Sequence, residues 1–346
     1  MHVLKGLLFS VAVLLVVAMS AAFFLPDRAS AERSIVIDRP PSMVFAVVDS
    51  FSLFNRWSPW ADLDPATNYS YTGPERGVGA SMTWASAKPE VGNGRQEIIS
   101  DISDEKVVTA LAFEGMSAAT STIRLTPVGE STRVSWRFDT ALPLGFDGDF
   151  FTGVIGRYFG LAMDGIIGKD YDKGLGKLKS LLEGMPKADI AGVEAVVQEV
   201  AAQPAYAIAG LQAGVDSASS SAVMGAAYGE IVALAQGNGV KLAGPPYALI
   251  RGHGNGKWQF DAGIPVDRND APASGRVSAT MTYAGRAGEF RHVGSYDSIA
   301  TTHARAEAWL ATRGLQEAGP RREIYVSDPV STPVDELVTL ISIPVR

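Results

Sequence analysis

The sequence contains no cysteine among its 346 residues. Its absence excludes thiol catalysis, disulfide bonds and cysteine-ligated zinc sites, and it leaves the redox state of the compartment open. Histidine is scarce, and no two histidines stand in an HxH or HxxxH pair that could share a metal ion. The four histidines are His2, His253, His292 and His303. We therefore expect neither a metal site nor a bound cofactor.

Runs of basic residues are also lacking. The formal net charge is −7 and the pI is near 5.2. Because phosphate backbones are bound by clustered lysine and arginine side chains, we expect no nucleic-acid partner. Apolar residues make up 47% of the chain and charged residues 19%, which is typical of a globular protein. A chain of this length exceeds one ordinary hydrophobic core, so we predict two domains.

One long hydrophobic run lies near the N-terminus. Residues 6–25 (GLLFSVAVLLVVAMSAAFFL) are all small or apolar, and Lys5 precedes them. Twenty residues in a helix span about 30 Å, the thickness of the hydrocarbon core of a bilayer. We interpret residues 1–26 as a transmembrane helix of a single-pass inner-membrane protein whose remainder faces the periplasm. The alternative is a signal peptide cleaved near residues 18–20, with secretion to the periplasm, but the apolar run continues beyond that point.

Strand and helix signals follow in an α+β order. Residues 32–38 alternate apolar and polar side chains, as in a strand, and Pro40 and Pro41 open a short helix. Residues 151–182 carry the periodicity of one long helix that ends at Gly184. The strand-like runs between the helices are residues 68–72, 79–86, 94–103, 106–115, 121–128 and 132–140. This order predicts that residues 33–184 form an antiparallel sheet wrapped on a long C-terminal helix, with a cavity between them.

Four segments of this domain resemble the START-related helix-grip superfamily, also called SRPBCC or polyketide cyclase-like. They are IDRPPSMVFAVVDSF, WSPW, TGPERGVGASMTW and DYDKGLGKLKSLLEG. The resemblance implies the helix-grip fold but selects no function, because the superfamily includes lipid carriers, hormone receptors and cyclases. We expect Trp84, Phe113 and Trp136 to line the cavity, with core packing as the alternative role of each.

Two features of this domain stay open. Acid–base chemistry would need a strand carboxylate buried beside a partner, and we interpret the strand carboxylates as solvent-exposed. They are Glu97, Asp101, Glu114 and Asp139. Seven glycines between Gly153 and Gly176 interrupt the long helix, each at a cost of about 1 kcal/mol relative to alanine. Either close approach to the sheet or a helix loose enough to admit a ligand would explain them.

An internal repeat follows residues 185–192 (MPKADIAG), which we interpret as a linker. Residues 243–245 (AGP) recur 75 positions later as residues 318–320, and residues 263–266 (GIPV) recur 79 positions later as residues 342–345 (SIPV). A strand signal and a helix signal precede each AGP. Residues 193–346 are therefore predicted to hold two strand–helix–strand–strand units in one sheet, with both helices on one face and a groove on the other.

This duplicated half resembles the GyrI-like family, which includes AraC-type effector-binding domains of multidrug-sensing regulators. The segments that carry the resemblance are WQFDAGIPV, HVGSYDSI, AWL and GPRREIYVSDPVSTPVDELVTLISIPV. The resemblance implies binding of flat, apolar, often cationic aromatic compounds, although some members hydrolyse strained-ring compounds. It also places the family's drug-binding glutamate at Glu323. Many members carry a second glutamate where this chain has Leu340, which weakens the hydrolase interpretation.

Strand alternation singles out the same glutamate. In residues 322–327 (REIYVS), Ile324 and Val326 share one face, which we expect to lie under the helices, so Glu323 and Tyr325 face the groove. A carboxylate flanked by aromatic rings in a partly dry groove attracts a cation. The alternative is a surface glutamate paired with a neighbouring arginine. The repeat places Ala248 at the equivalent position, so the fold does not require the charge.

The sequence favours a membrane-tethered, non-catalytic protein that binds or senses an apolar small molecule, with cationic aromatic compounds as one class. Besides Glu323, the expected groove residues are Tyr206, Tyr247, Trp258, Tyr283, Tyr296 and Tyr325, with packing as the alternative role. We assign no catalytic residue. Two alternatives stay open, namely a hydrolase of a hydrophobic or strained-ring substrate in which Glu323 activates water, and a non-catalytic envelope factor. No helix-turn-helix segment is present, so signalling would need a protein partner, which the sequence does not identify.

Overall fold

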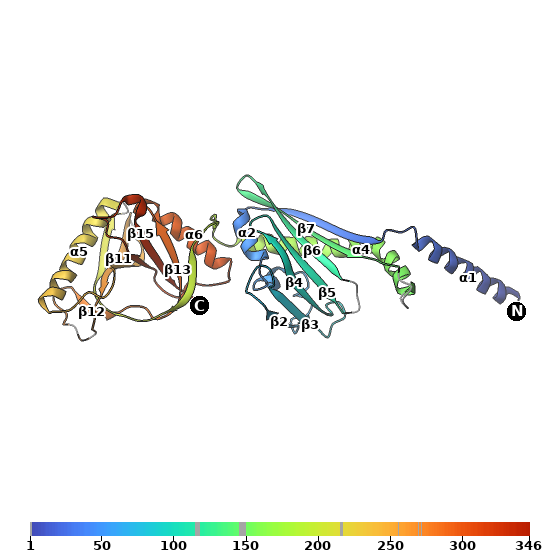
Figure 1. The fold of residues 1–346 in the computed structure, drawn as a ribbon, viewed down its shortest axis with the longest axis horizontal. Helices are drawn as coiled ribbons and strands as arrows, with labels where there is room; N and C mark the ends of the chain where they lie inside the picture. The colour runs from blue at the N-terminus through green and yellow to red at the C-terminus, as the bar shows by residue number, and fades with distance from the viewer. Residues whose placement is uncertain are drawn as a thin grey trace. The chain divides into compact units, whose positions relative to one another are not determined.

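The computed structural model describes residues 2–114, 118–144, 150–214, 217–254, 256–268, 270 and 272–346. It divides into two compact units, unit 1 (Met1–Asp189) and unit 2 (Ile190–Arg346). Each unit is built on one antiparallel sheet with helices against it (Figure 1). The predicted α+β class is confirmed.

Unit 1 contains a seven-stranded sheet in the order β1-β7-β6-β5-β4-β3-β2. All neighbouring strands are antiparallel. The strands are β1 (Arg28–Ile37), β2 (Asn68–Thr72), β3 (Ser81–Ala85), β4 (Asn93–Ile102), β5 (Lys106–Phe113), β6 (Ala119–Val128) and β7 (Ser131–Ala141). Two short helices, α2 (Pro41–Val48) and α3 (Phe54–Trp57), connect β1 to β2, and the long helix α4 (Phe150–Glu183) packs along β1. The predicted antiparallel sheet with one long helix after it is present, with strands close to the predicted runs.

The N-terminal segment forms the helix α1 (His2–Ala22). Arg157 of α4 donates hydrogen bonds to the carbonyl oxygens of Ala22 and Leu25, at 3.1 and 3.0 Å. A membrane span takes about 20 consecutive apolar residues. In the described part of the chain, no helix is both long enough and apolar enough to cross a membrane. The expected transmembrane helix is therefore not supported, and the location of the protein in the cell stays a prediction.

Aromatic rings occupy the space between the sheet of unit 1 and α4. Trp136 of β7 stacks on Tyr171 of α4, with ring centroids 3.8 Å apart and planes 8° apart. Trp57 meets the Trp136 ring edge-on at 5.3 Å, and all three side chains are almost fully buried. Trp84 and Phe113 form a separate half-buried T-shaped pair at 5.6 Å. Trp136, which we expected to line a cavity, thus packs against other rings of the domain.

Close approach explains four of the helix glycines. A Cβ atom at Gly174 would lie 2.7 Å from Trp136 Cζ3 and 3.1 Å from Pro59 Cδ, and one at Gly153 would lie 2.6 Å from the Pro143 carbonyl oxygen. Gly160 and Gly168 are similarly tight, whereas Gly156, Gly165 and Gly176 have nothing within 4 Å of that position. The glycines therefore let α4 approach the sheet and its flanking segments at those four positions.

Unit 2 contains an eight-stranded sheet in the order β12-β9-β11-β10-β14-β15-β13-β8. Its strands are β8 (Ala195–Val200), β9 (Pro204–Gly214), β10 (Tyr247–Gly254), β11 (Lys257–Pro265), β12 (Ser278–Met281), β13 (Gly285–Val293), β14 (Arg322–Tyr325) and β15 (Val338–Pro344). The helices are α5 (Ser217–Gly237) and α6 (Ile299–Ala311), with short 3-10 turns η1 (Tyr296–Ser298) and η2 (Val334–Glu336). The two predicted strand–helix–strand–strand repeats are present, as β9-α5-β10-β11 and β13-α6-β14-β15.

Equivalent hydrogen bonds show that the two strand–helix–strand–strand repeats of unit 2 are copies of one another. The Ala243 amide donates to the Pro265 carbonyl at 2.9 Å, and the Ala318 amide donates to the Pro344 carbonyl at 2.8 Å. β10 and β14 meet in the middle of the sheet, where Ala248 is the cross-strand partner of Glu323. These two residues are equivalent in the repeat, so the pseudo-twofold axis passes between them.

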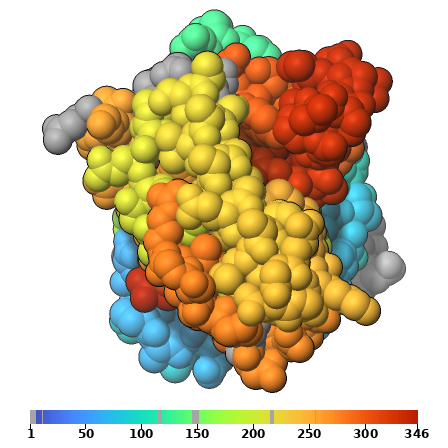
Figure 2. Space-filling view, turned by 90° about the vertical axis from the view of Figure 1, so that its left-hand side faces the viewer, coloured from blue at the N-terminus to red at the C-terminus, as the bar shows by residue number. Residues whose placement is uncertain are grey.

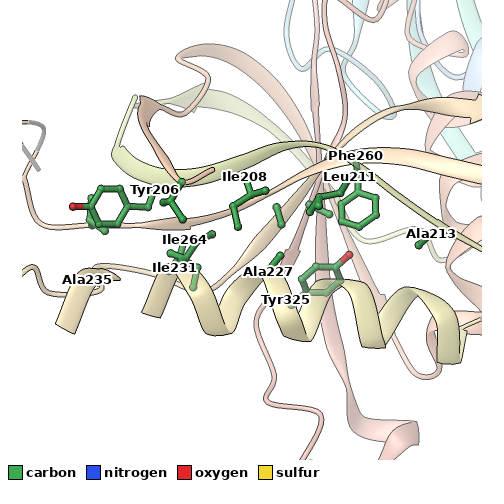
Figure 3. Close-up of a cluster of buried hydrophobic side chains, with 14 of the residues drawn as sticks. Tyr206, Ile208, Leu211, Ala213, Ala227, Ile231, Ala235, Phe260, Ile264 and Tyr325 are labelled. Atoms are coloured by element: carbon green, nitrogen blue, oxygen red, sulfur yellow. The ribbon is translucent and has the colours of Figure 1, made fainter. Parts of the chain in front are cut away.

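The faces of β14 are the reverse of those predicted. Tyr325 belongs to a buried cluster with Ala227 and Ile231 of α5, and its ring lies against that helix (Figure 3). Glu323 and Tyr325 are buried under the helices, whereas Ile324 is half-buried and Val326 is 55% exposed. Alternation correctly pairs residues on a face but does not reveal which face the helices cover.

We predict that Gly174→Ala destabilises unit 1, because the new methyl group would overlap a Trp136 ring that Trp57 and Tyr171 hold in place. Overpacking of this kind costs about 1–3 kcal/mol. Gly176→Ala is the matched control two residues along the same helix, and it should stabilise by up to about 1 kcal/mol through helix propensity. Denaturant unfolding of both variants checks this. Equal stability of the two variants would contradict the close-approach explanation.

A buried carboxylate in unit 1 yields a pH-dependent prediction. Asp49 is 5% exposed, and its Oδ1 has no hydrogen-bond partner among the described residues. Burial, assisted by the nearby Asp101 charge, raises the pKa of Asp49 from 3.8 to about 6. Because the folded state holds this proton more tightly, the contribution to stability is present below pH 4 and is lost as the pH rises through 6.

We therefore expect Asp49→Asn to raise the unfolding free energy at pH 8 by about 2 kcal/mol and to change it little at pH 4. Denaturant titrations at the two pH values measure the difference. Glu97→Gln is the control, since Glu97 pairs with Arg95 at 2.6 Å on the surface, and it should change stability by less than about 0.5 kcal/mol. An equal effect of Asp49→Asn at both pH values would rule out an ionised buried carboxylate.

Candidate functional site: a cavity between two helices

Unit 2 holds a cavity of about 1070 Å³ between α5, α6 and the sheet. Met224, Gly225 and Tyr228 of α5 line it, and so do Ile299, Ala300 and His303 of α6. Positions three and four residues apart lie on one face of a helix, so each helix turns one side to the cavity. The small side chains at 225 and 300 leave the space between the helices unfilled. In Figure 2, the yellow atoms of α5 lie on the face of unit 2 turned toward the viewer.

The two walls of the cavity are repeats of one another. Tyr228 and His303 are 75 positions apart, the same interval that separates the two AGP segments and also Gly239 from Gly314. Met224 and Ile299, and Gly225 and Ala300, are separated by the same interval. The pseudo-twofold axis thus relates the wall that α5 forms to the wall that α6 forms.

Glu323 lies on β14 at the floor of the cavity and is only 7% exposed. The Tyr325 hydroxyl donates a hydrogen bond to Glu323 Oε2 at 2.8 Å, and His303 Nε2 lies 2.7 Å from Glu323 Oε1. A buried carboxylate costs several kcal/mol unless its oxygens are bonded. Both oxygens have a partner here, which is how the unit tolerates an acid in its interior.

The alternative interpretation, in which Glu323 is a surface residue paired with a neighbouring arginine, is wrong. Arg321, which also lines the cavity, pairs instead with Glu307 and Glu317, at 2.5 Å in each case. The Arg322 guanidinium carbon lies 5.6 Å from the centre of the Tyr247 ring. Neither arginine forms an ion pair with Glu323 in the described structure.

The tyrosines around Glu323 are held in their protonated form. Burial raises the pKa of Tyr325 well above 10, and the Glu323 charge acts in the same direction. Burial and then the Glu323 charge likewise raise the pKa of Tyr228 and of Tyr296. The Tyr296 ring meets Tyr325 edge-on at 5.7 Å. Each phenol therefore keeps a proton that it can donate.

Two buried polar atoms belong to side chains of the helix walls. Tyr228 Oη and His303 Nδ1 are buried, and neither has a hydrogen-bond partner within the described residues. Both side chains line the cavity, and they occupy equivalent positions on the two helices. Buried polar groups are nearly always bonded, so leaving these two atoms without a partner costs the unit stability.

Four of the predicted ligand-binding residues line this cavity, namely Glu323, Tyr325, Tyr296 and Trp258. The Trp258 indole donates to the Ser220 hydroxyl at 2.9 Å, which fixes its ring against α5. Their contact with a ligand stays a prediction, but the structure brings them together.

The other predicted residues lie elsewhere. Tyr206 is fully buried in the core and donates to the Pro272 carbonyl at 2.8 Å. Tyr247 is buried against Gly263, and Tyr283 is 37% exposed with its hydroxyl bonded to the Arg286 carbonyl. None of these three lines the cavity. Trp84, Phe113 and Trp136 belong to unit 1 and are described above.

His303, Tyr228 and Met224 are among the cavity residues that were not predicted from the sequence. The sequence does contain a pattern that relates them. Tyr228 and His303 are separated by the 75-residue interval of the repeat, and Met224 lies four residues before Tyr228, on the same face of the helix. Among the described residues, no group of three or more His, Asp or Glu side chains could hold a metal ion. Leu340 is the cross-strand partner of Ile324, on the side of the sheet away from the cavity.

Comparisons with known proteins agree with this description. Residues 28–183 match the family model described as polyketide cyclase / dehydrase and lipid transport, and residues 199–346 match that of the GyrI-like small molecule binding domain. A search of curated proteins found no match.

Several solved structures resemble the chain at low identity. The EcmrR C-terminal domain is 19% identical, with 45% of this chain and 98% of that chain covered and a TM-score of 0.39. EcmrR in a DNA complex is 18% identical, with 59% and 75% covered and a TM-score of 0.40. A hydrolase from Listeria innocua is 16% identical, with 44% and 92% covered and a TM-score of 0.34. Because these TM-scores are below 0.5, we infer nothing about function from them.

Both resemblances predicted from the sequence are thus confirmed in their predicted order. The chain thus matches two family models in succession, that of polyketide cyclase / dehydrase and lipid transport and then that of the GyrI-like small molecule binding domain.

Proposed function

We propose that the GyrI-like domain binds an apolar, ring-containing small molecule in the cavity between α5 and α6, with Glu323 as its polar anchor. The observation that carries the proposal is a cavity of about 1070 Å³ with a buried carboxylate at its floor. Ligand sites typically enclose about 300–1,000 Å³ and combine an apolar lining with a few placed polar groups. Met224, Ile299 and Trp258 provide apolar lining of this kind.

Cationic aromatic compounds are the class that the electrostatics favours. The carboxylate of Glu323 and the rings of Tyr325 and Tyr296 lie together, and a cation is attracted both by a charge and by the face of a ring. The proposal concerns unit 2, since in unit 1 the rings of Trp57, Trp136 and Tyr171 pack together between the sheet and α4.

Filling the cavity tests the site. We expect the purified full-length chain to quench the fluorescence of 9-aminoacridine saturably, and Gly225→Phe to weaken this binding by at least about tenfold, or 1.4 kcal/mol. A Cβ atom at Gly225 would point into open space at the cavity wall. Gly229 is the matched control, since it lies one turn along α5, has equally open space and does not line the cavity. Gly229→Phe should leave the affinity unchanged, and equal weakening by both variants would place binding elsewhere.

Removing the anchor charge tests the role of Glu323. We predict that Glu323→Gln, which keeps the shape of the side chain, weakens 9-aminoacridine binding by about tenfold or more, as expected for loss of a buried charged partner. Glu307 is a second carboxylate in the cavity lining, but it is neutralised by Arg321 at 2.5 Å and is 37% exposed. Glu307→Gln should therefore change the affinity by less than about twofold. An unchanged affinity in Glu323→Gln would remove the carboxylate from the proposal.

A further inference from the structure

We propose that the cavity prefers cationic amphiphiles and holds them in one orientation, with the cationic ring system toward Asp328 and an uncharged tail toward Trp258. This inference rests on the proposed function and names the class of ligand more closely. A cavity that attracted cations by net charge alone would favour a second positive group on the tail. The distribution of charge along this cavity favours an uncharged tail instead.

The cavity is elongated along the strands in the middle of the sheet. β10 and β14 are antiparallel, and the Tyr325 amide donates a hydrogen bond to the Pro246 carbonyl at 2.9 Å. The chain that continues from Tyr325 to Asp328 therefore lies toward the beginning of β10. Trp258 is instead the cross-strand partner of His253, near the end of β10, seven residues and about 20 Å of strand from Pro246. Asp328 and Trp258 both line the cavity, so they mark its opposite ends.

The end at Asp328 is acidic. Asp297 and Asp328 line it and are exposed, and neither carboxylate forms an ion pair within the part of unit 2 that the structure describes. The Tyr296 ring lies at the same end, edge-on to Tyr325 at 5.7 Å. Burial and then the charges of Glu323 and Asp328 raise the pKa of Tyr296, so both carboxylates act at this ring. A cationic ring system is therefore attracted here by charge and by an aromatic neighbour.

The end at Trp258 has no unpaired carboxylate among the described lining residues. Arg321 lies at this end, since the Ile250 amide donates to its carbonyl at 2.8 Å, and its guanidinium is paired with Glu307 and Glu317. Ile250 and Trp258 provide apolar lining. A positive group placed here would meet no unpaired negative charge and would lie near a guanidinium, whereas an apolar tail would be covered.

The two ends differ because the two repeats, though copies in shape, differ in charge. Among the described lining residues, every Asp, Glu, Lys or Arg belongs to the second repeat, β13-α6-β14-β15. The positions 75 residues before Asp297 and Glu323 hold Ala222 and Ala248. A symmetric cavity would accept a ligand in two equivalent orientations. This cavity distinguishes its ends, so it can hold a ligand whose own ends differ.

The test compares two acridines of equal size. In 9-(nonylamino)acridine the tail is uncharged, and in 9-(8-aminooctylamino)acridine an ammonium group replaces the terminal methyl group. We expect the full-length chain to bind the nonyl compound at least about tenfold more tightly in fluorescence titrations. Each buried methylene group strengthens binding by up to about fourfold, whereas the ammonium group would lose its hydration without gaining a partner.

Equal affinities, or tighter binding of the compound with the ammonium tail, would overturn this inference and leave the proposed function standing. Absence of binding by both compounds and by 9-aminoacridine would instead reject the proposed function, and this inference with it.

Ser221→Glu locates the tail. Ser221 lines the cavity on α5, next to Ser220, whose hydroxyl accepts a hydrogen bond from the Trp258 indole at 2.9 Å. A carboxylate at this end should tighten binding of the ammonium tail by at least about threefold and change binding of the nonyl tail by less than about twofold. Ala222→Glu is the matched control, since Ala222 is the exposed neighbour outside the cavity lining, and it should change neither affinity. No gain in Ser221→Glu, or the same gain in both variants, would overturn the placement of the tail.

Asp328→Asn locates the ring system. We expect it to weaken binding of both acridines by the same factor, about twofold to fivefold, because both place their rings at this end. Asp335→Asn is the matched control, since Asp335 is an exposed aspartate seven residues along the chain that does not line the cavity, and it should change neither affinity. Selective weakening of the compound with the ammonium tail would place the tail, rather than the rings, toward Asp328. That result, or unchanged affinity for both compounds, would overturn the proposed orientation.

Discussion

The burial of one carboxylate sets the conditions for the rest of unit 2. Glu323 lies in the middle of an eight-stranded sheet, under two helices, with 7% of its surface exposed. Such a group persists only because Tyr325 and His303 bond to its two oxygens. The helix α6 must therefore stand where it presents His303 to β14, and Tyr325 must share the face of Glu323. The same constraint keeps the polar floor in one geometry before any ligand arrives, which lowers the entropy cost of binding.

Duplication explains both the size of the cavity and the single carboxylate at its floor. Two copies of one unit meet at β10 and β14, so the two helices stand side by side and small residues at 225 and 300 leave a space between them. Strict symmetry would place carboxylates at 248 and 323, which are cross-strand partners, and like charges at such positions repel. The chain holds alanine at one position and glutamate at the other. It thereby keeps the shape of a symmetric cavity and gives it one polar end.

Local patterns in the sequence were sufficient for most of the fold and only part of the site. Periodicity and turn residues located nearly every strand and helix, because these signals act over a few residues. Alternation correctly placed Glu323 and Tyr325 on one face, but it could not say that α5 and α6 cover that face, since Ile324 is also apolar. The contact of His303 with Glu323 joins a helix to a strand 20 residues away, and only packing in three dimensions decides it. The position of Tyr228 in the cavity could have been predicted once His303 was placed there, because the 75-residue interval of the repeat makes the two positions equivalent.

The two units solve the same packing problem in opposite ways. In each, helices lie against an antiparallel sheet. Unit 1 fills the space with Trp57, Trp136 and Tyr171, and glycines such as Gly174 let the helix approach those rings. In unit 2, Gly225 and Ala300 are the small residues on the two helix walls, and part of the space between the helices and the sheet stays open. An open cavity forgoes packing energy, and leaving Tyr228 Oη and His303 Nδ1 unpaired adds to that loss. Unit 2 therefore gives up stability at the one place where its polar groups converge, which is the pattern expected of a binding site.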